Sequence, residues 1–325
     1  MLRAVCSITK QYPGTISSGI IGLVLQLAFT VFFVASVLAV SAIGSSGYVV
    51  LIVYMLFSFY WTSEVIRNLV HVTVSGLFAT YYFYGVSRGG NGSVVDVPVK
   101  NPTVASFKRA ATTSFGSVCF GSLIIAIIQT IRAVIRSAAQ NQANDGNMIG
   151  AFCLICLNCF MGCIQNLIEY FNKYAYTRVA IYGEDFCTAA KKTWQMLKSR
   201  GIDAIINDSL IGNVLGMGAL FLGLVVGAIV WFYARNTNMI SVTCNNPTKC
   251  ATTSPGTILN FWSIIFTVAG FFLGLLPYSS LSTVIDSGVA TTFVCLADSP
   301  DALQRTKPEL YQKVLETYPH VMLQA

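Results

Sequence analysis

Six long apolar segments restrict what this chain can fold into. They cover residues 17–43, 48–84, 115–137, 149–171, 210–234 and 257–297. A bilayer core roughly 30 Å thick needs about 20 apolar residues of α-helix to cross it. Backbone groups in lipid must bond within their own segment, and the alternating pattern of a membrane β-barrel is not seen here. We therefore expect an all-α polytopic membrane protein with about six transmembrane helices.

The composition supports a membrane location. Only 10% of the residues are charged and 54% are hydrophobic, with a mean hydropathy of +0.65, whereas soluble domains carry about 25% charged residues. The first segment follows Arg3 and Lys10 and, at 27 residues, is long for a signal peptide. We expect it to remain as a membrane span.

The positive net charge of +7 is unevenly distributed. Two Lys and Arg residues precede the first segment, four lie in the 85–114 loop, six in the 172–209 loop and three in the 299–325 tail. Four more lie on the other side of the membrane, and Arg67, inside the second segment, completes the twenty. Cytosolic loops are enriched in these residues. We expect a transmembrane bundle over 1–298 with both loops, both termini and the 299–325 tail cytosolic, and no nucleic-acid partner.

The last two segments contain features that affect helix packing. Glycines four residues apart predict close approach of a neighbouring helix, and these pairs are Gly212/Gly216, Gly223/Gly227 and Gly270/Gly274. Segment 257–297 is too long for one upright crossing. Pro277 predicts a kink there, because proline removes a helical hydrogen bond.

The cysteines suggest two different roles. Four of them repeat the spacing of an iron–sulfur site, but their segment has no proline and is predicted to be one helix, where they would form a stripe of small packing residues: Cys153, Cys156, Cys159 and Cys163. Cys244 and Cys250 flank a short loop that we place outside the cell, where disulfides persist. They are a candidate disulfide.

No enzyme is indicated. The sequence has no glycine-rich phosphate loop followed by lysine, no HExxH and no G-x-S-x-G. Only two histidines are present, so a metal site or a catalytic triad is hard to assemble. We expect no catalytic residues, no cofactor and no metal.

Three ionisable residues occur in the second segment, within "YWTSEVIRNLVHVT" (60–73). Glu64, Arg67 and His71 are spaced three and four apart, which places them on one helix face. A charge near the bilayer centre costs about 3 kcal/mol on insertion scales. Two interpretations follow: a Glu64–Arg67 ion pair that fixes helix packing with His71 as a hydrogen-bonded core residue, or a polar lining of a transport pathway.

Nearby aromatic residues favour a pathway for an organic cation. A quaternary ammonium is attracted to aromatic faces and to a carboxylate but donates no strong hydrogen bond. The candidate substrate-binding residues are Tyr60, Trp61, Glu64, Arg67, Asn68 and His71. Gln129 and Asp286 are further polar candidates for the pathway, although hydrogen bonding between helices is the simpler role for Gln129 and Asn158.

Several blocks of this sequence resemble the choline transporter-like family. They are "YWTSEVIRNLVHVTVSG" (60–76), "FGSVCFGSLIIAIIQTIR" (115–132) and "YAYTRVAIYGEDFCTAA" (174–190), and "PELYQKVLETYP" (308–319) is similar to the C-terminus of fungal and other microbial members. The blocks keep the family's order from about residue 50 to the end.

The resemblance implies a sodium-independent plasma-membrane carrier for choline and related amino alcohols. Members have about ten spans, so the six found here correspond to the C-terminal portion, and we expect about four N-terminal spans and a hydrophilic leader to be missing. The implied partners are a small organic cation and the lipid bilayer; the oligomeric state is left open.

We expect transport by alternating access. Tyr60 and Trp61 would hold the ammonium, Glu64 would neutralise it, Arg67 would tune Glu64, and His71 would exchange a proton. The alternatives are a non-transporting membrane scaffold or an inactive fragment of such a transporter; an open channel is a third interpretation, although no ring of like charges is seen.

Overall fold

The computed structural model describes residues 2–43, 48–87, 95–96, 99–236, 255–306 and 311–312. The chain forms two compact units. The first comprises Met1–Asn207 together with Thr283–Ala325, and the second comprises Asp208–Ser282. Two long helices, α7 (Phe186–Asn236) and α9 (Pro255–Asp298), contribute to both units.

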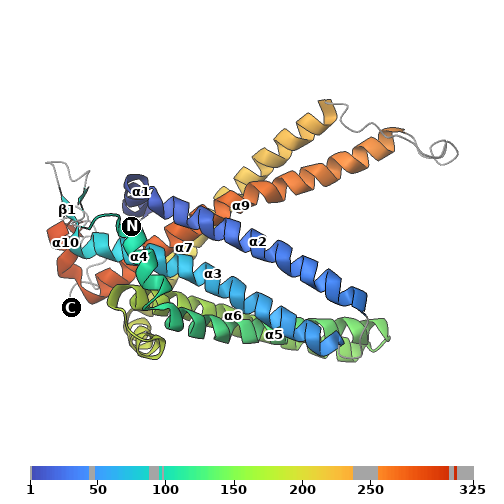
Figure 1. The fold of residues 1–325 in the computed structure, drawn as a ribbon, viewed down its shortest axis with the longest axis horizontal. Coiled ribbons are helices and arrows are strands. Elements are labelled where there is room, and N and C mark those ends of the chain that lie inside the picture. Colours follow the sequence, from blue (N-terminus) through green and yellow to red (C-terminus); the bar gives the residue numbers. More distant parts are fainter. Residues whose placement is uncertain are drawn as a thin grey trace. The chain divides into compact units, whose positions relative to one another are not determined.

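The first unit is a helical bundle (Figure 1). Its elements besides the ends of α7 and α9 are α1 (Leu2–Gln11), α2 (Gly14–Ile43), α3 (Tyr48–Tyr84), β1 (Val86–Ser87), β2 (Val95–Asp96), α4 (Pro102–Ala111), α5 (Phe115–Asn144), α6 (Met148–Tyr182) and α10 (Pro300–Thr306). Helix α3 packs against α2, α4, α5 and α6, and α5 lies alongside α6. The two strands form a short antiparallel pair.

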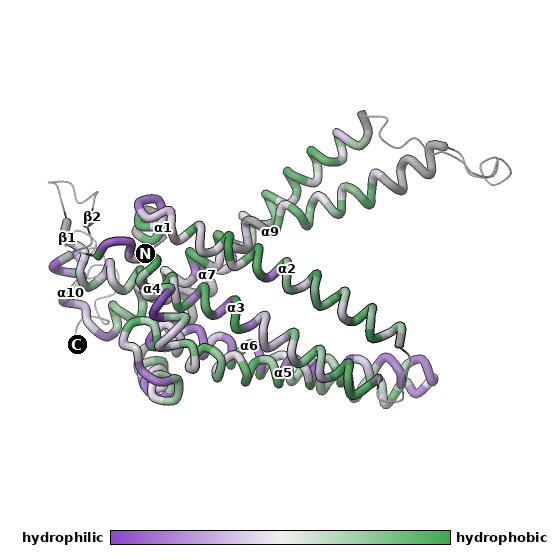
Figure 2. Tube along the Cα trace, viewed as in Figure 1, coloured by the Kyte–Doolittle hydropathy of each residue, from purple (hydrophilic) through white to green (hydrophobic). Residues whose placement is uncertain are grey.

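Six helices of the described chain are long and apolar enough to cross a membrane, which confirms the predicted all-α membrane fold. The candidate spans are Gly14–Ala42, Val49–Tyr84, Phe115–Asn144, Met148–Tyr182, Ile211–Ala234 and Leu281–Asp298. Figure 2 shows hydrophobic residues along α2 and hydrophilic residues at the turn between α5 and α6.

Both basic stretches expected to be loops contain regular structure. Helix α6 continues to Tyr182, where Gly183, with a φ of 69°, ends it in the left-handed conformation that glycine adopts without strain. Helix α7 begins at Phe186, so that only residues 183–185 separate the two helices. Stretch 85–114 likewise contains the strand pair and α4. Both connections between membrane spans therefore contain helical residues, and their cytosolic side stays a prediction.

The core of the first unit lies where α3, α5 and α6 meet. Val72, Val118 and Tyr176 are almost completely buried in one cluster, against which Phe186 also packs. Gly121 on α5 makes this packing possible, because a Cβ there would lie 2.4 Å from the Tyr176 hydroxyl oxygen. The close approach of α5 and α6 thus depends on a residue without a side chain.

The second unit is a hairpin of α7 and α9, and it confirms two of the three glycine pairs. On α7, a Cβ at Gly223 would lie 2.8 Å from Phe271 of α9, and Gly227 also faces α9. On α9, a Cβ at Gly274 would lie 2.9 Å from Val226 of α7, and Gly270 also faces α7. At Gly212 and Gly216 a Cβ would meet nothing described within 4 Å. Pro277 lies inside the continuous helix α9, and its kink stays a prediction.

The closely spaced cysteines lie on the uninterrupted helix α6, as predicted. All four are exposed: Cys153, Cys156, Cys159 and Cys163. This face of α6 does not meet another helix among the described residues, so their packing role stays a prediction. The candidate disulfide partners Cys244 and Cys250 and most of the 299–325 tail lie outside the described residues.

Candidate functional site

The Glu64 carboxylate is buried on α3 and accepts two hydrogen bonds from other side chains. Arg67 Nη2 donates to Glu64 Oε2 over 2.6 Å, and Gln129 Nε2 on α5 donates to Glu64 Oε1 over 2.9 Å. The Glu64 side chain is 8% exposed, whereas that of Arg67 is 52% exposed. Both interpretations of these residues include this ion pair. Gln129 holds Glu64 from within the bundle, whereas the Arg67 side chain reaches the surface.

Asn68 lies one turn further along α3 in a neutral polar contact. Its side-chain amide donates to Ser122 Oγ over 2.9 Å and is 3.5 Å from the Tyr176 hydroxyl. The Tyr176 hydroxyl in turn donates to the Val118 carbonyl. All of these side chains are buried, so Asn68 connects α3 to both α5 and α6.

His71 is buried and contacts two other helices. Its Nε2 is 3.1 Å from the Lys173 carbonyl oxygen and 3.2 Å from Thr177 Oγ1 on α6, and its Nδ1 is 2.7 Å from Ser287 Oγ on α9. A carbonyl oxygen only accepts, so Nε2 carries the proton of a neutral ring. The Ser287 hydroxyl lies 2.7 Å from His71 Nδ1 and 2.7 Å from the Thr283 carbonyl oxygen on α9, and its one proton serves both acceptors. A change in the protonation of His71 would therefore alter its contact with α9.

Two ion pairs join α6 to the C-terminal half of α9. Lys173 Nζ lies 2.6 Å from Asp286 Oδ1, and Arg178 Nη1 lies 2.6 Å from Asp298 Oδ2. The Tyr182 hydroxyl also donates to Asp298 Oδ2 over 2.9 Å. Asp286 thus belongs to the surroundings of His71, through Lys173, and not to those of Glu64.

A third polar network lies between α5 and α6. Arg132 donates to Asn158 Oδ1 and to Gln165 Oε1, and Gln165 Nε2 donates to Glu169 Oε1 over 2.7 Å. Sequence reasoning counted Arg132 among the four basic residues on the side opposite the cytosol, and Lys173 and Arg178 among the six of the 172–209 loop. The spacing of Gln165, Glu169 and Lys173, four residues apart on one helix face, could have shown that a polar face of α6 continues to Lys173. It does not reveal the partners on α9.

The two aromatic candidates take part in packing contacts. Tyr60 is tilted against Phe59 with ring centroids 5.9 Å apart. Trp61 stacks on Phe57 at 6.1 Å, and its Nε1 donates to the Cys119 carbonyl over 3.1 Å. Both rings are half-buried.

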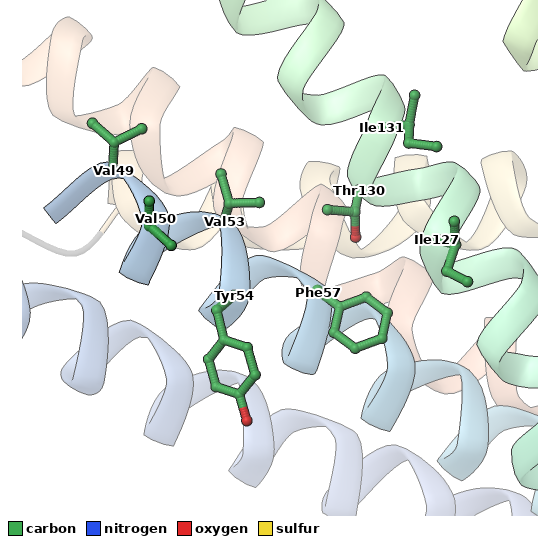
Figure 3. A pocket seen from close by; sticks show the side chains of 8 residues that line it. All are labelled: Val49, Val50, Val53, Tyr54, Phe57, Ile127, Thr130 and Ile131. Carbon is green, nitrogen blue, oxygen red and sulfur yellow. The ribbon is translucent and has the colours of Figure 1, made fainter. Parts of the chain in front are cut away.

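An apolar cavity of about 460 Å³ lies next to these aromatic residues, between α3 and α5 (Figure 3). Its walls are Val49, Val50, Val53, Tyr54, Phe57, Ile127, Thr130 and Ile131. None of the six candidate substrate-binding residues is in this wall. Phe57 nevertheless connects the cavity to Trp61 by stacking, and Thr130 directly follows Gln129.

The arrangement suits recognition of a cation more than chemistry on a substrate. It offers a buried carboxylate paired with a half-exposed arginine, aromatic side chains one turn away on α3, and a buried imidazole. Among the described residues, no group of three His, Cys, Asp or Glu side chains could hold a metal ion.

Known proteins show the same sequence pattern over the whole chain. Protein PNS1 of Cryptococcus neoformans is 34% identical over 99% of this chain and 57% of its own length, and Protein PNS1 of Mycosarcoma maydis is 36% identical over 99% and 59%. A CTL-like protein of Dictyostelium discoideum is 33% identical over 98% and 52%. The chain thus spans a little over half the length of these relatives.

A family profile extends the resemblance further towards the N-terminus than residue 50. The profile described as plasma-membrane choline transporter matches residues 1–301, which include every described membrane span. The chain therefore belongs to the plasma-membrane choline transporter family.

Proposed function

We propose that this chain carries choline or a related small organic cation across the plasma membrane by alternating access, without sodium and with His71 exchanging a proton. Membership of a choline transporter family supports the substrate class. The observation that carries the proposal is the Glu64 carboxylate, buried within a membrane span and held by a cation whose own side chain is half exposed.

Arg67 acts in this proposal as a replaceable counter-ion. A carboxylate in a membrane span needs a positive partner, because leaving it unpaired costs several kcal/mol. Arg67 supplies that partner in the described conformation. When Arg67 turns out towards the surface, a substrate ammonium takes its position and Glu64 stays neutralised throughout.

Aromatic residues complete the proposed site. The methyl groups of choline carry its positive charge and cannot donate strong hydrogen bonds, so aromatic faces suit them. Tyr60 and Trp61 lie one turn before Glu64 on α3, and the cavity beside Phe57 offers an approach to them. Rotation of Trp61 away from Phe57 would join the cavity to the carboxylate.

In this proposal, the contacts of His71 and the two ion pairs between α6 and α9 change when the pathway switches from one side of the membrane to the other. His71 contacts both helices through hydrogen bonds, and Lys173–Asp286 and Arg178–Asp298 hold the same two helices together. Protonation of the ring would make Nδ1 a donor to Ser287 Oγ, whose own proton would then go to the Thr283 carbonyl oxygen. This would couple proton uptake to the contact of α3 with α9.

Uptake of radiolabelled choline into proteoliposomes containing the purified chain tests the proposal. We expect Glu64→Gln to reduce uptake at least tenfold, because it removes the charge that the ammonium needs. Glu184→Gln, in the short connection before α7, is the matched control and should leave uptake unchanged. Equal uptake by wild type and Glu64→Gln would assign Glu64 to helix packing alone.

A non-transporting scaffold is the second candidate function. It is favoured by the ion pair itself, since Glu64 and Arg67 neutralise each other without a ligand. Cysteine substitutions at positions 61, 64 and 71, made one at a time in a chain without its other cysteines, distinguish the two. A water-soluble thiol reagent should reach these positions in a transporter and should not reach them in a scaffold.

A further inference from the structure

A second cavity, of about 310 Å³, lies on the other side of α3, between α2, α3 and α4. Most of its lining residues are apolar, including Leu25 and Val70. Gly22 keeps the cavity narrow beside Val70, since a Cβ there would lie 2.5 Å from Val70 Cγ2. Ser18 and Thr103 also line it, near the start of α2. The cavity is therefore a hydrophobic slot with polar residues at one end, which we call its mouth.

The slot has the depth of one leaflet. It follows α2 from Gly14 to Leu25, which at 1.5 Å per residue is roughly 16 Å, or about half of a 30 Å bilayer core. At the mouth, α4 crosses the start of α2 closely enough that a Cβ at Gly14 would lie 2.7 Å from Thr103 Oγ1. Helix α4 therefore lies where the membrane span of α2 begins.

The segments around the mouth are positively charged. Residues 1–43 and 99–114 contain five Lys and Arg and no Asp or Glu. Lys10, Lys100 and Lys108 are exposed, and each lies within four residues of a residue in the cavity wall. Arg109 is already used, because its guanidinium donates to the Ala180 carbonyl. The three lysines are thus exposed cations close in sequence to the residues that line the slot.

We propose that this slot binds an anionic glycerophospholipid, with one acyl chain between α2 and α3 and the phosphate against Lys10, Lys100 and Lys108. The acyl chain gains little by leaving the bilayer, because lipid tails are as apolar as the slot. Selectivity for the lipid therefore comes from the lysines, each of which strengthens attraction to an anionic surface about fivefold. If the start of α2 faces the cytosol, as the charge distribution predicts, the slot opens into the leaflet that carries such lipids.

Photo-cross-linking in nanodiscs tests the site independently of transport. The full chain is reconstituted with trace phosphatidylserine or phosphatidylcholine, each bearing a photoreactive acyl chain, and labelled peptides are identified by mass spectrometry. We expect phosphatidylserine to label residues 14–25, 66–73 and 103–107 several-fold more than phosphatidylcholine does. The difference should shrink in 0.5 M salt, because the lysines are exposed and screened.

Variants separate the two parts of the site. A triple variant should be labelled equally by both lipids when the three lysines of the site are replaced by glutamine (Lys10, Lys100 and Lys108). Lys191→Gln on α7 should keep the preference for phosphatidylserine. Ser18→Phe should fill the slot and reduce labelling by both lipids, whereas Ile131→Phe, in the other cavity, should not. Each variant is compared only after it elutes as a single species in size-exclusion chromatography.

Two results would overturn the proposal. Equal labelling of the wild-type slot by both lipids would show an ordinary lipid-facing groove, and labelling concentrated on other helices would place the bound lipid elsewhere. Neither result depends on whether the chain transports choline.

Discussion

Gln129 on α5 donates a hydrogen bond of 2.9 Å to the buried Glu64 carboxylate on α3. Together with Arg67, this amide satisfies a carboxylate that would otherwise lie unpaired in a membrane span. The contact joins two helices through one polar pair, so a loss of Gln129 affects both the packing of α3 and the properties of Glu64.

Gln129→Leu should destabilise the bundle. It removes the donor but leaves a buried acceptor, which costs about 1–3 kcal/mol. We expect a lower melting temperature in detergent, measured by tryptophan fluorescence, whereas Gln140→Leu, at an exposed position on the same helix, should change it little. An unchanged melting temperature for Gln129→Leu would show that solvent replaces the amide.

Gly121→Ala should weaken the core between α5 and α6. The new Cβ would lie 2.4 Å from the Tyr176 hydroxyl and 2.5 Å from Phe186 Cε2, and overpacking of this kind costs about 1–3 kcal/mol. Gly116→Ala on the same helix is the control, because a Cβ there would meet nothing described within 4 Å. Thermal unfolding of both variants checks the prediction; equal stability would mean that Tyr176 moves freely aside.

The pairing of Lys173 with Asp286 should appear in a double-mutant cycle. Lys173→Met alone should cost about 1 kcal/mol, a value reduced from that of a fully buried pair because Asp286 is 36% exposed. Asp286→Leu in the same background should recover part of that loss, since no unpaired charge remains. Additive losses in the unfolding free energy would contradict a direct coupling.

Asp185 should give a pH-dependent contribution to the start of α7. The Thr188 N–H donates to Asp185 Oδ2 over 3.0 Å, and the hydrogen bonds from Thr188 lower the pKa of the Asp185 carboxyl. A carboxyl with a lowered pKa stabilises the fold above its unfolded pKa, and this contribution is lost as pH falls through the folded pKa. Asp185→Ala should therefore lower the melting temperature at pH 7, and the difference from wild type should shrink as the pH falls through the lowered pKa of the folded state. A constant difference at all pH values would assign the effect to something other than the carboxylate.

The predicted parts of this structure are those that depend on local sequence. Hydropathy predicts the six spans because each helix satisfies its own backbone. The spacing of Glu64 and Arg67 predicts an ion pair because residues three apart are neighbours on a helix. Lys173 and Arg178 were counted as loop charges, and the prediction missed that both lie on α6 and pair with α9.

Tertiary contacts explain that failure. Asp286 and Asp298 neutralise Lys173 and Arg178 from more than 100 residues away, and no periodicity within α6 reveals such partners. The same holds for His71, whose Ser287 partner is 216 residues distant. Helix identity and the ion pair within α3 were therefore predictable, whereas polar partners on other helices were not.

Arg67→Gln is the variant that most directly tests the exchange of Arg67 for a substrate cation. If choline must displace the guanidinium from Glu64 Oε2, removing that guanidinium removes a competitor, and choline should bind more tightly. A competing ion pair worth about 1 kcal/mol corresponds to about a fivefold lower Kd. If the bound state is stabilised and the barrier to release is unchanged in energy, release of the substrate becomes slower, so the maximal rate of uptake should fall while affinity rises.

Equilibrium binding of radiolabelled choline and initial rates of uptake measure the two effects separately. Arg67→Lys, which keeps the charge, should retain near-wild-type values. Weaker binding of choline to Arg67→Gln would mean that Arg67 organises the site instead of competing for it.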